Sequence, residues 1–254
     1  MALRESYQCR LDSSKWAVNG MSKPQRLQEE GQCAYCGQHD MLTVDHVIPR
    51  CLFDGVTSGV PGDVPKVGAC RQCNNAKSTD DTLLRDVLIR DLRLAEHPIA
   101  QTIRHGAHAR SISRGKSQYP RAASRLRFVP SPTGSGLLVA EPILPKERLH
   151  GIFTRLVRGL MVAYEHYELA STTNFDVLRA ADTKVALVEA RRWAADTSGM
   201  VHTVQAGDGS VFWCVYYHSL TPGHLNLSQW WLRFYELAVY WVSTDMSNLS
   251  LDKF

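Results

Sequence analysis

The stretch CAYCGQHDMLTVDHVIPR at residues 33–50, with CRQCNNAK at residues 70–77, contains two Cys-x-x-Cys pairs. The four cysteines are Cys33, Cys36, Cys70 and Cys73. Residues 31–80 are rich in Cys, Asp, Asn, Gly and Pro, so this segment needs a cross-link because its side chains cannot build a large core. Two pairs at this spacing are typical of four thiolates around one structural Zn²⁺. Free thiols and a redox pair are the alternatives.

The order of the surrounding residues adds a second signal. Asp45 and His46 lie between the pairs, Pro49 follows them, and Asn74 and Lys77 come directly after the second pair. With this pattern, residues 31–80 resemble the HNH (ββα-metal) endonuclease family. The resemblance implies a β-hairpin that carries Asp45 and His46, a loop, and a helix that begins near residues 70–74. It also implies that the zinc clamps the hairpin to the helix without touching the substrate.

The resemblance also assigns roles to individual residues. His46 corresponds to the general base that activates water, and Asp45 and Asn74 correspond to the ligands of a single catalytic Mg²⁺ or Mn²⁺ ion. One hard cation beside one imidazole is sufficient chemistry for phosphodiester hydrolysis. Lys77 and Arg50 are expected to contact phosphates, whereas solvated surface charges are the alternative for both.

One position departs from the family pattern. The family has an asparagine five residues before the third cysteine, where it braces the loop beside the base, and this chain has Pro65 there. Asp63 lies nearby and is a candidate substitute. The sequence therefore predicts a metal-dependent DNA endonuclease from a phage, mobile element or defence system. The alternatives are a non-catalytic, zinc-stabilised nucleic-acid- or protein-binding module and a nuclease subunit that stays inactive until a partner protein binds.

The fold class expected for the whole chain is α+β. A zinc-stapled ββα-metal module is expected to precede a basic helical linker and an α+β domain with aromatic-rich antiparallel strands. The boundaries expected are 1–30 for a helical lead-in, 31–95 for the nuclease module, 96–140 for the linker and 141–254 for the C-terminal domain of uncertain role.

Local patterns predict several elements. Apolar spacing predicts helices over 81–95, over 149–164 and near 176–195. Aromatic and β-branched residues predict strands at 210–218 and 229–242, with a turn at Pro222-Gly223 between them.

Charge is unevenly distributed. Residues 1–130 carry a net charge of +6 and residues 131–254 a net charge of −2, and residues 97–130 have seven basic side chains and no acidic one. This imbalance favours a polyanionic partner, and DNA is the first candidate. We expect the basic stretch to contact its phosphates. Residues 141–254 are the candidate surface for a protein partner or self-association.

The remaining signals are weaker. No apolar run reaches the length of a membrane span, and the start lacks the apolar core of a signal peptide, so we expect a cytoplasmic protein without membrane contact. Cys9, Cys51 and Cys214 are expected to be free, buried thiols. His105 and His108 are expected to be exposed to solvent.

Overall fold

The computed structural model describes residues 29–56, 61–62, 64–117, 126–130, 138–142, 146–165, 175–179, 200–206, 209–218 and 228–244. The architecture is mixed α+β, and every strand pairing in it is antiparallel. Among the described residues, no helix combines the length and the apolar composition that crossing a bilayer requires.

The N-terminal part consists of a small sheet and a long helix. Strands β1 (Glu29–Gln32), β2 (His39–His46) and β3 (Lys66–Cys70) form a sheet in that order, and helix α1 (Arg71–Leu88) follows β3 directly. The register pairs Leu42 with Cys70 and His46 with Lys66. Asp45 and His46 therefore lie at the end of the central strand.

Helix α1 begins inside the range expected from the motif. The side chain of Cys70 accepts a hydrogen bond from the Cys73 backbone N–H, so the second Cys-x-x-Cys pair also provides the N-cap. The helix runs without interruption to Leu88 and is followed by a 3-10 turn, η3 (Leu92–Leu94). The helix expected over 81–95 is confirmed over 81–88, where it is the second half of α1, but the α-helix ends at Leu88 and does not reach residue 95.

A second helical stretch follows, made of α2 (Pro98–Ile103), a π-helical turn η4 (Arg104–His108) and α3 (Ala109–Ser113). Strands β4 (Leu126–Pro130) and β5 (Leu138–Pro142) then form a two-stranded sheet. The basic stretch is thus largely helical over residues 98–113. Its last five residues form β4.

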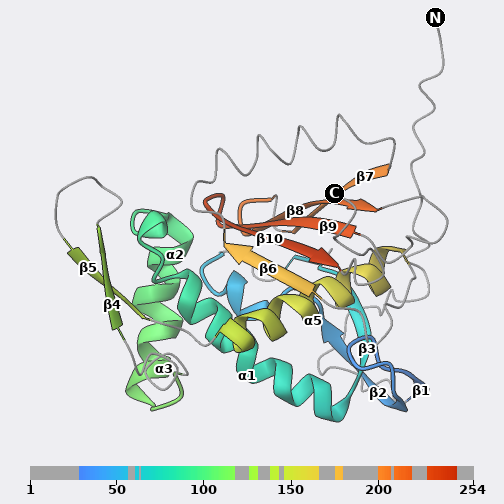
Figure 1. Cartoon of the computed structure of the whole chain (residues 1–254). Coiled ribbons are helices and arrows are strands. Elements are labelled where there is room, and N and C mark those ends of the chain that lie inside the picture. Colours follow the sequence, from blue (N-terminus) through green and yellow to red (C-terminus); the bar gives the residue numbers. More distant parts are fainter. Residues whose placement is uncertain are drawn as a thin grey trace, which may run out of the picture.

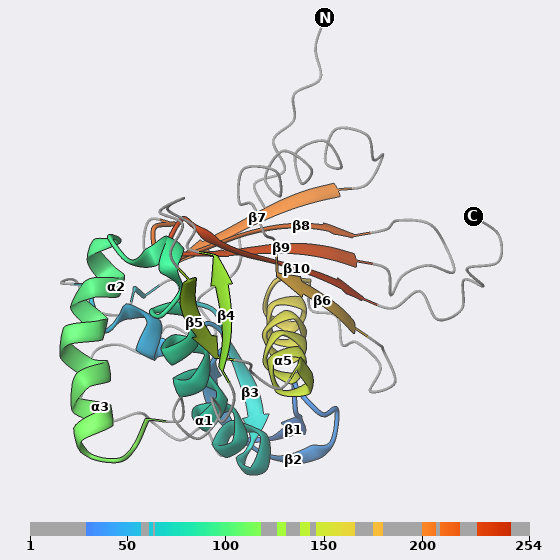
Figure 2. The same cartoon turned by 60° about the vertical axis from the view of Figure 1, so that its left-hand side comes forward.

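The C-terminal part is a five-stranded sheet with one long helix. Helix α5 (Lys146–Glu165) precedes β6 (Phe175–Arg179), β7 (Met200–Ala206), β8 (Phe212–His218), β9 (Ser228–Phe234) and β10 (Ala238–Thr244), and the strand order is β6-β10-β9-β8-β7. Figures 1 and 2 show α5 between this sheet and the part formed by α1 and β1–β3.

Two expectations for the C-terminal part were wrong. Strand β6 occupies residues 175–179, so the helix expected near 176–195 does not begin there, and residues 180–195 lie outside the described residues. Of the helical lead-in expected over 1–30, residues 1–28 also lie outside the described residues, and the last two belong to β1. Residues 229–242 are a hairpin of β9 and β10, not one strand. The chain reverses at Tyr235 and Glu236, which have φ values of 47° and 61°.

The two parts share one continuous hydrophobic core. Helix α5 contacts both α1 and β3, and Phe153 on its other side packs against Phe234 and Tyr240 of the large sheet. Tyr235 is fully buried and its hydroxyl donates to the Leu52 carbonyl at 2.9 Å. Leu52 belongs to η2 (Arg50–Phe53), the turn that follows the Asp45-His46 segment. The large sheet is therefore in direct contact with the segment that carries the motif.

Candidate functional site

The four motif cysteines form a cluster at the junction of the small sheet and α1. The sulfur atoms of Cys33, Cys36, Cys70 and Cys73 all lie within 4.8 Å of one another. The Sγ atoms of Cys36 and Cys70 are 3.9 Å apart, close to the ~3.8 Å edge of a tetrahedron with ~2.3 Å Zn–S bonds. All four are free thiols, and the cluster is placed to hold one metal ion.

The electrostatics of the cluster also fit a cation. Burial, the Cys70 side chain and the charge of Cys33 all raise the pKa of the Cys73 thiol. Four thiolates at this separation repel one another, and a divalent cation between them removes that cost. Donor chemistry and geometry therefore both match a structural Zn²⁺.

Strand β2 and helix α1 contact each other through alternate residues of the strand. Asn74 Nδ2 donates to Thr43 Oγ1 at 2.8 Å, and Lys77 Nζ lies 3.5 Å from Asp45 Oδ2. Thr43 and Asp45 share one face of β2, and Asn74 and Lys77 share one side of α1. The structure thus brings Asp45 and Asn74, which are 29 positions apart, to neighbouring places in one interface.

The two oxygens of Asp45 have different surroundings. The Tyr35 hydroxyl donates to Oδ2 at 2.6 Å, on the side where Lys77 also lies. Within the described part of the chain, Oδ1 of Asp45 and Oδ1 of Asn74 accept no hydrogen bond, although the other polar atom of each side chain is engaged. One carboxylate oxygen and one amide oxygen therefore remain available, and both are of the type that could hold a hard cation.

Lys77 lies inside the protein. It is 4% exposed, and its ammonium group donates to the His46 carbonyl at 2.9 Å and to Asp81 at 2.8 Å. Burial raises the pKa of Asp81 to about 6, although the nearby Lys77 charge acts to lower it. The expected contact between Lys77 and a phosphate has no support in this arrangement, because the ammonium group is already surrounded by protein oxygens.

His46 has an electropositive environment. Burial, Lys66 and Arg50 lower its pKa to about 4, and the opposing effect of Asp45 is smaller. The imidazole is therefore neutral at physiological pH, the form that accepts a proton. Strand β2 ends at His46, where the alternation of faces also ends.

Lys66 is a further candidate residue, which the sequence alone did not identify. It pairs with His46 across the β2–β3 ladder, so both side chains lie on the same face of the sheet. Lys66 and Arg50 are both exposed and act on the same imidazole. No motif identifies Lys66, because its position beside His46 follows from strand register alone.

The position of Pro65 also has a structural explanation. The Val47 backbone N–H donates to the Pro65 carbonyl at 2.9 Å, so a main-chain bond braces the residue after His46. A proline provides this acceptor as well as any other residue does. Asp63, the candidate substitute for the missing asparagine, lies outside the described residues.

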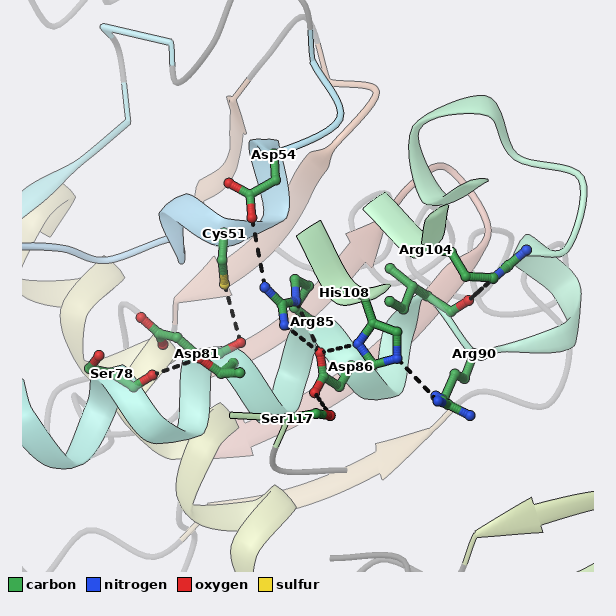
Figure 3. A network of polar contacts seen from close by, with 12 residues as sticks. Cys51, Asp54, Ser78, Asp81, Arg85, Asp86, Arg90, Arg104, His108 and Ser117 are labelled. Carbon is green, nitrogen blue, oxygen red and sulfur yellow. Dashed lines mark hydrogen bonds and ion pairs between the residues drawn. The ribbon is translucent and has the colours of Figure 1, made fainter. Parts of the chain in front are cut away.

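A second polar cluster lies on the other half of α1 (Figure 3). Asp86 is completely buried and accepts hydrogen bonds from Arg85, Ser117 and His108. Burial acts to raise the pKa of Asp86, but hydrogen bonds from His108, Ser117 and Arg85 outweigh it and lower the pKa. This cluster, which we call the Asp86 cluster, connects residues 108–117 to α1.

His108 was expected to be exposed, and this was wrong. It is 2% exposed, with Nδ1 2.9 Å from Asp86 Oδ1 and Nε2 3.1 Å from the Arg90 guanidinium. Because arginine only donates, Nε2 accepts and Nδ1 carries the proton. The buried carboxylate of Asp86, 22 positions earlier, stabilises a histidine in an otherwise basic stretch.

Arg104 is also used within the fold. Its guanidinium donates to the carbonyls of Ile89, Leu94 and Ala95, which follow the end of α1. At least this one of the seven basic residues of 97–130 therefore has a structural role. Arg121 and Arg125 of the same stretch lie outside the described residues.

The other cysteines are consistent with structural thiols. Cys51 donates to the Asp81 carbonyl, and burial raises its pKa to about 12. Cys214 is fully buried in β8, and burial raises its pKa as well. Cys9 lies outside the described residues.

Comparison with protein-family models, with curated proteins and with solved structures finds no match to this chain.

Proposed function

We propose that this protein is a metal-dependent endonuclease of the HNH type that hydrolyses DNA phosphodiester bonds. One observation carries the proposal. The segment that closes the four-cysteine cluster also starts α1, and α1 brings Asn74 to the face of β2 that bears Asp45, one residue before His46.

The roles follow from the local chemistry. Neutral His46 removes a proton from the attacking water. Asp45 and Asn74 would hold one Mg²⁺ or Mn²⁺ through oxygens that have no other partner in the described part of the chain. The bound cation would offset the negative charge that develops on the phosphate and the leaving oxygen. Arg50 and Lys66 neutralise the phosphate backbone beside the base.

Cleavage of supercoiled plasmid tests the proposal. Purified protein is incubated with supercoiled plasmid, linear duplex, single-stranded DNA and RNA, each with Mg²⁺, with Mn²⁺ and with EDTA. We expect cation-dependent nicking or cleavage of DNA, and we expect His46→Ala to reduce its rate at least about a hundredfold, the lower end of what general-base catalysis contributes.

A matched control separates loss of chemistry from loss of fold. His39 is an exposed histidine at the other end of β2, so His39→Ala removes the same side chain from the same strand. We expect His39→Ala to cut at the wild-type rate, and His46→Ala to keep its zinc content and unfolding midpoint. Equal cutting by wild type and His46→Ala would contradict the proposal.

The position of Lys77 favours a second candidate function. Its ammonium group lies 3.5 Å from Asp45 and supplies positive charge where the cation is proposed to bind. If Lys77 always takes the place of the cation beside Asp45, the protein would be a zinc-stabilised module that binds nucleic acid or protein without catalysis. For such a module, retention on DNA would fall steeply with salt, and no cleavage would occur with any metal.

A further inference from the structure

Tyr35 connects the Asp45 carboxylate to helix α5. It is the second spacer residue of the first Cys-x-x-Cys pair, is 5% exposed, and donates its hydroxyl to Asp45 Oδ2 at 2.6 Å.

Helix α5 approaches the other side of the Tyr35 ring. A Cβ atom added at Gly159 would lie 2.8 Å from Val47 Cγ1 and 3.2 Å from Tyr35 Cε1. Glycine at this position is therefore what allows α5 to lie directly against both residues. Val47 is fully buried and follows the Asp45-His46 pair, so α5 lies against two residues that adjoin the proposed site.

We infer that Tyr35 is a positioning residue for the proposed cation ligand Asp45, and that α5 fixes Tyr35 through the close contact at Gly159. This inference rests on the proposed function. The hydroxyl occupies Oδ2, which restricts the rotation of the carboxylate and would leave Oδ1 available to a cation. Hydrogen-bond partners of metal ligands commonly change metal affinity or activity 10- to 100-fold when they are removed.

Tyr35→Phe tests this role because it removes the hydroxyl and keeps the ring against Gly159. The readout is the affinity of the zinc-loaded full-length protein for Mn²⁺, followed by the loss of the free Mn²⁺ signal in electron paramagnetic resonance. We expect Mn²⁺ binding to weaken about tenfold or more. We also expect plasmid cleavage by this variant to recover when Mn²⁺ is raised to saturation, because His46 is unchanged.

Tyr235→Phe is the matched control. Tyr235 is also buried, and its hydroxyl donates to the main-chain carbonyl of Leu52 and not to Asp45. Both variants lose one buried hydrogen bond and are expected to lose about 1 kcal/mol of stability. Only Tyr35→Phe is expected to change the affinity for Mn²⁺.

A second pair of variants tests the contribution of α5. Gly159→Ala introduces a methyl group that presses on Val47 and Tyr35, so we expect weaker Mn²⁺ binding although the hydroxyl is still present. Gly151→Ala makes the same change on the same helix, where the nearest atom is a flexible arginine end at 3.9 Å. We expect this variant to bind Mn²⁺ as wild type does.

The outcomes separate the inference from the proposed function. Wild-type Mn²⁺ affinity in Tyr35→Phe, together with normal binding and cutting by the parent protein, would overturn the inference alone. A parent protein that neither binds Mn²⁺ nor cuts DNA would overturn the proposed function and the inference together.

Discussion

Lys77 and Asp81 lie one turn apart on α1 and form a buried ion pair beneath the end of β2. The Lys77 ammonium group also donates to the His46 carbonyl and lies near Asp45. These contacts join the helix to the part of the strand that bears the proposed site. A single cation thus compensates two carboxylates that are mostly removed from water.

Replacement of Lys77 tests this internal role. Lys77→Met keeps the length of the side chain and removes the charge, so Asp81 and Asp45 lose their buried counter-ion. We expect the free energy of unfolding to fall by about 3–5 kcal/mol, the usual cost of breaking a buried pair. Urea unfolding measures this change, and exposed Asn75→Ala on the same helix is expected to stay within about 0.5 kcal/mol of wild type. If Lys77→Met left the free energy of unfolding unchanged, this would contradict the internal role.

The electropositive surroundings of His46 lead to a second prediction. A histidine pKa of about 4 in the folded protein lies below its ordinary value of 6.5, so the folded state binds fewer protons than the unfolded state between these two values. The contribution of His46 to stability therefore decreases as the pH falls through that interval. Titration of the imidazole by NMR should give a midpoint near 4 in protein without added Mg²⁺ or Mn²⁺.

Lys66→Met provides the control for that titration. Removing a nearby positive charge favours the protonated imidazole, so the pKa of His46 should rise. Arg114→Met removes the positive charge of a residue that is not among the groups shifting the pKa of His46. This variant should leave the midpoint unchanged. An unchanged midpoint in Lys66→Met would show that Lys66 does not face the imidazole.

At the scale of elements, the Asp86 cluster attaches the helical stretch 98–117 to α1. Its hydrogen bonds lower the pKa of Asp86, so the folded state favours the ionised carboxylate. This stabilisation is complete above the ordinary aspartate pKa of 3.8 and is lost as the pH falls below it.

Asp86→Ala tests the attachment. The change leaves His108 and Ser117 without their shared acceptor in a buried place, and we expect a loss of about 3–5 kcal/mol. Thr79→Ala, at an exposed position of the same helix, should change stability by less than about 0.5 kcal/mol. If urea unfolding gave the same midpoint for both variants, the attachment would not depend on Asp86.

Several elements could be predicted from the sequence because their signal is local. The Cys-x-x-Cys spacing identified the four-cysteine cluster, and the start of α1 followed from it because Cys70 is both a member of the cluster and the N-cap. The β9–β10 turn could not be predicted, because Tyr235 and Glu236 are not residue types that favour positive φ. Burial of Tyr235 against Leu52 stabilises that turn, and such a contact leaves no trace in a local pattern.

In the candidate site, too, local sequence signals could be predicted and long-range contacts could not. Spacing within the motif identified Asp45, His46 and Asn74, whereas Lys66 becomes visible only when β2 and β3 are paired. The burial of His108 depends on Asp86, which is distant in sequence. Long-range partners of this kind, and the internal use of Lys77, needed the three-dimensional structure.

At the scale of the whole molecule, the shared core predicts that the two parts unfold together. Every tryptophan except Trp16 lies at position 193 or later, so tryptophan fluorescence reports on the C-terminal part. We expect a chelator that strips zinc from the four-cysteine cluster to lower the thermal midpoint seen by tryptophan fluorescence by several degrees. Thiol reactivity of the cysteines would report that the metal has been removed. If the fluorescence midpoint then stayed unchanged, the two parts would unfold independently.

The contact between Tyr235 and Leu52 also has a consequence for biosynthesis. These residues are 183 positions apart, so the segment around Asp45 and His46 cannot reach its final packing until most of the chain has left the ribosome. At about 5–20 residues per second, the delay after the four cysteines have emerged is on the order of 10 seconds or more. During that interval the nascent chain presents four unprotected thiols, and early capture of a metal ion would keep them from oxidation while the C-terminal half is still being made.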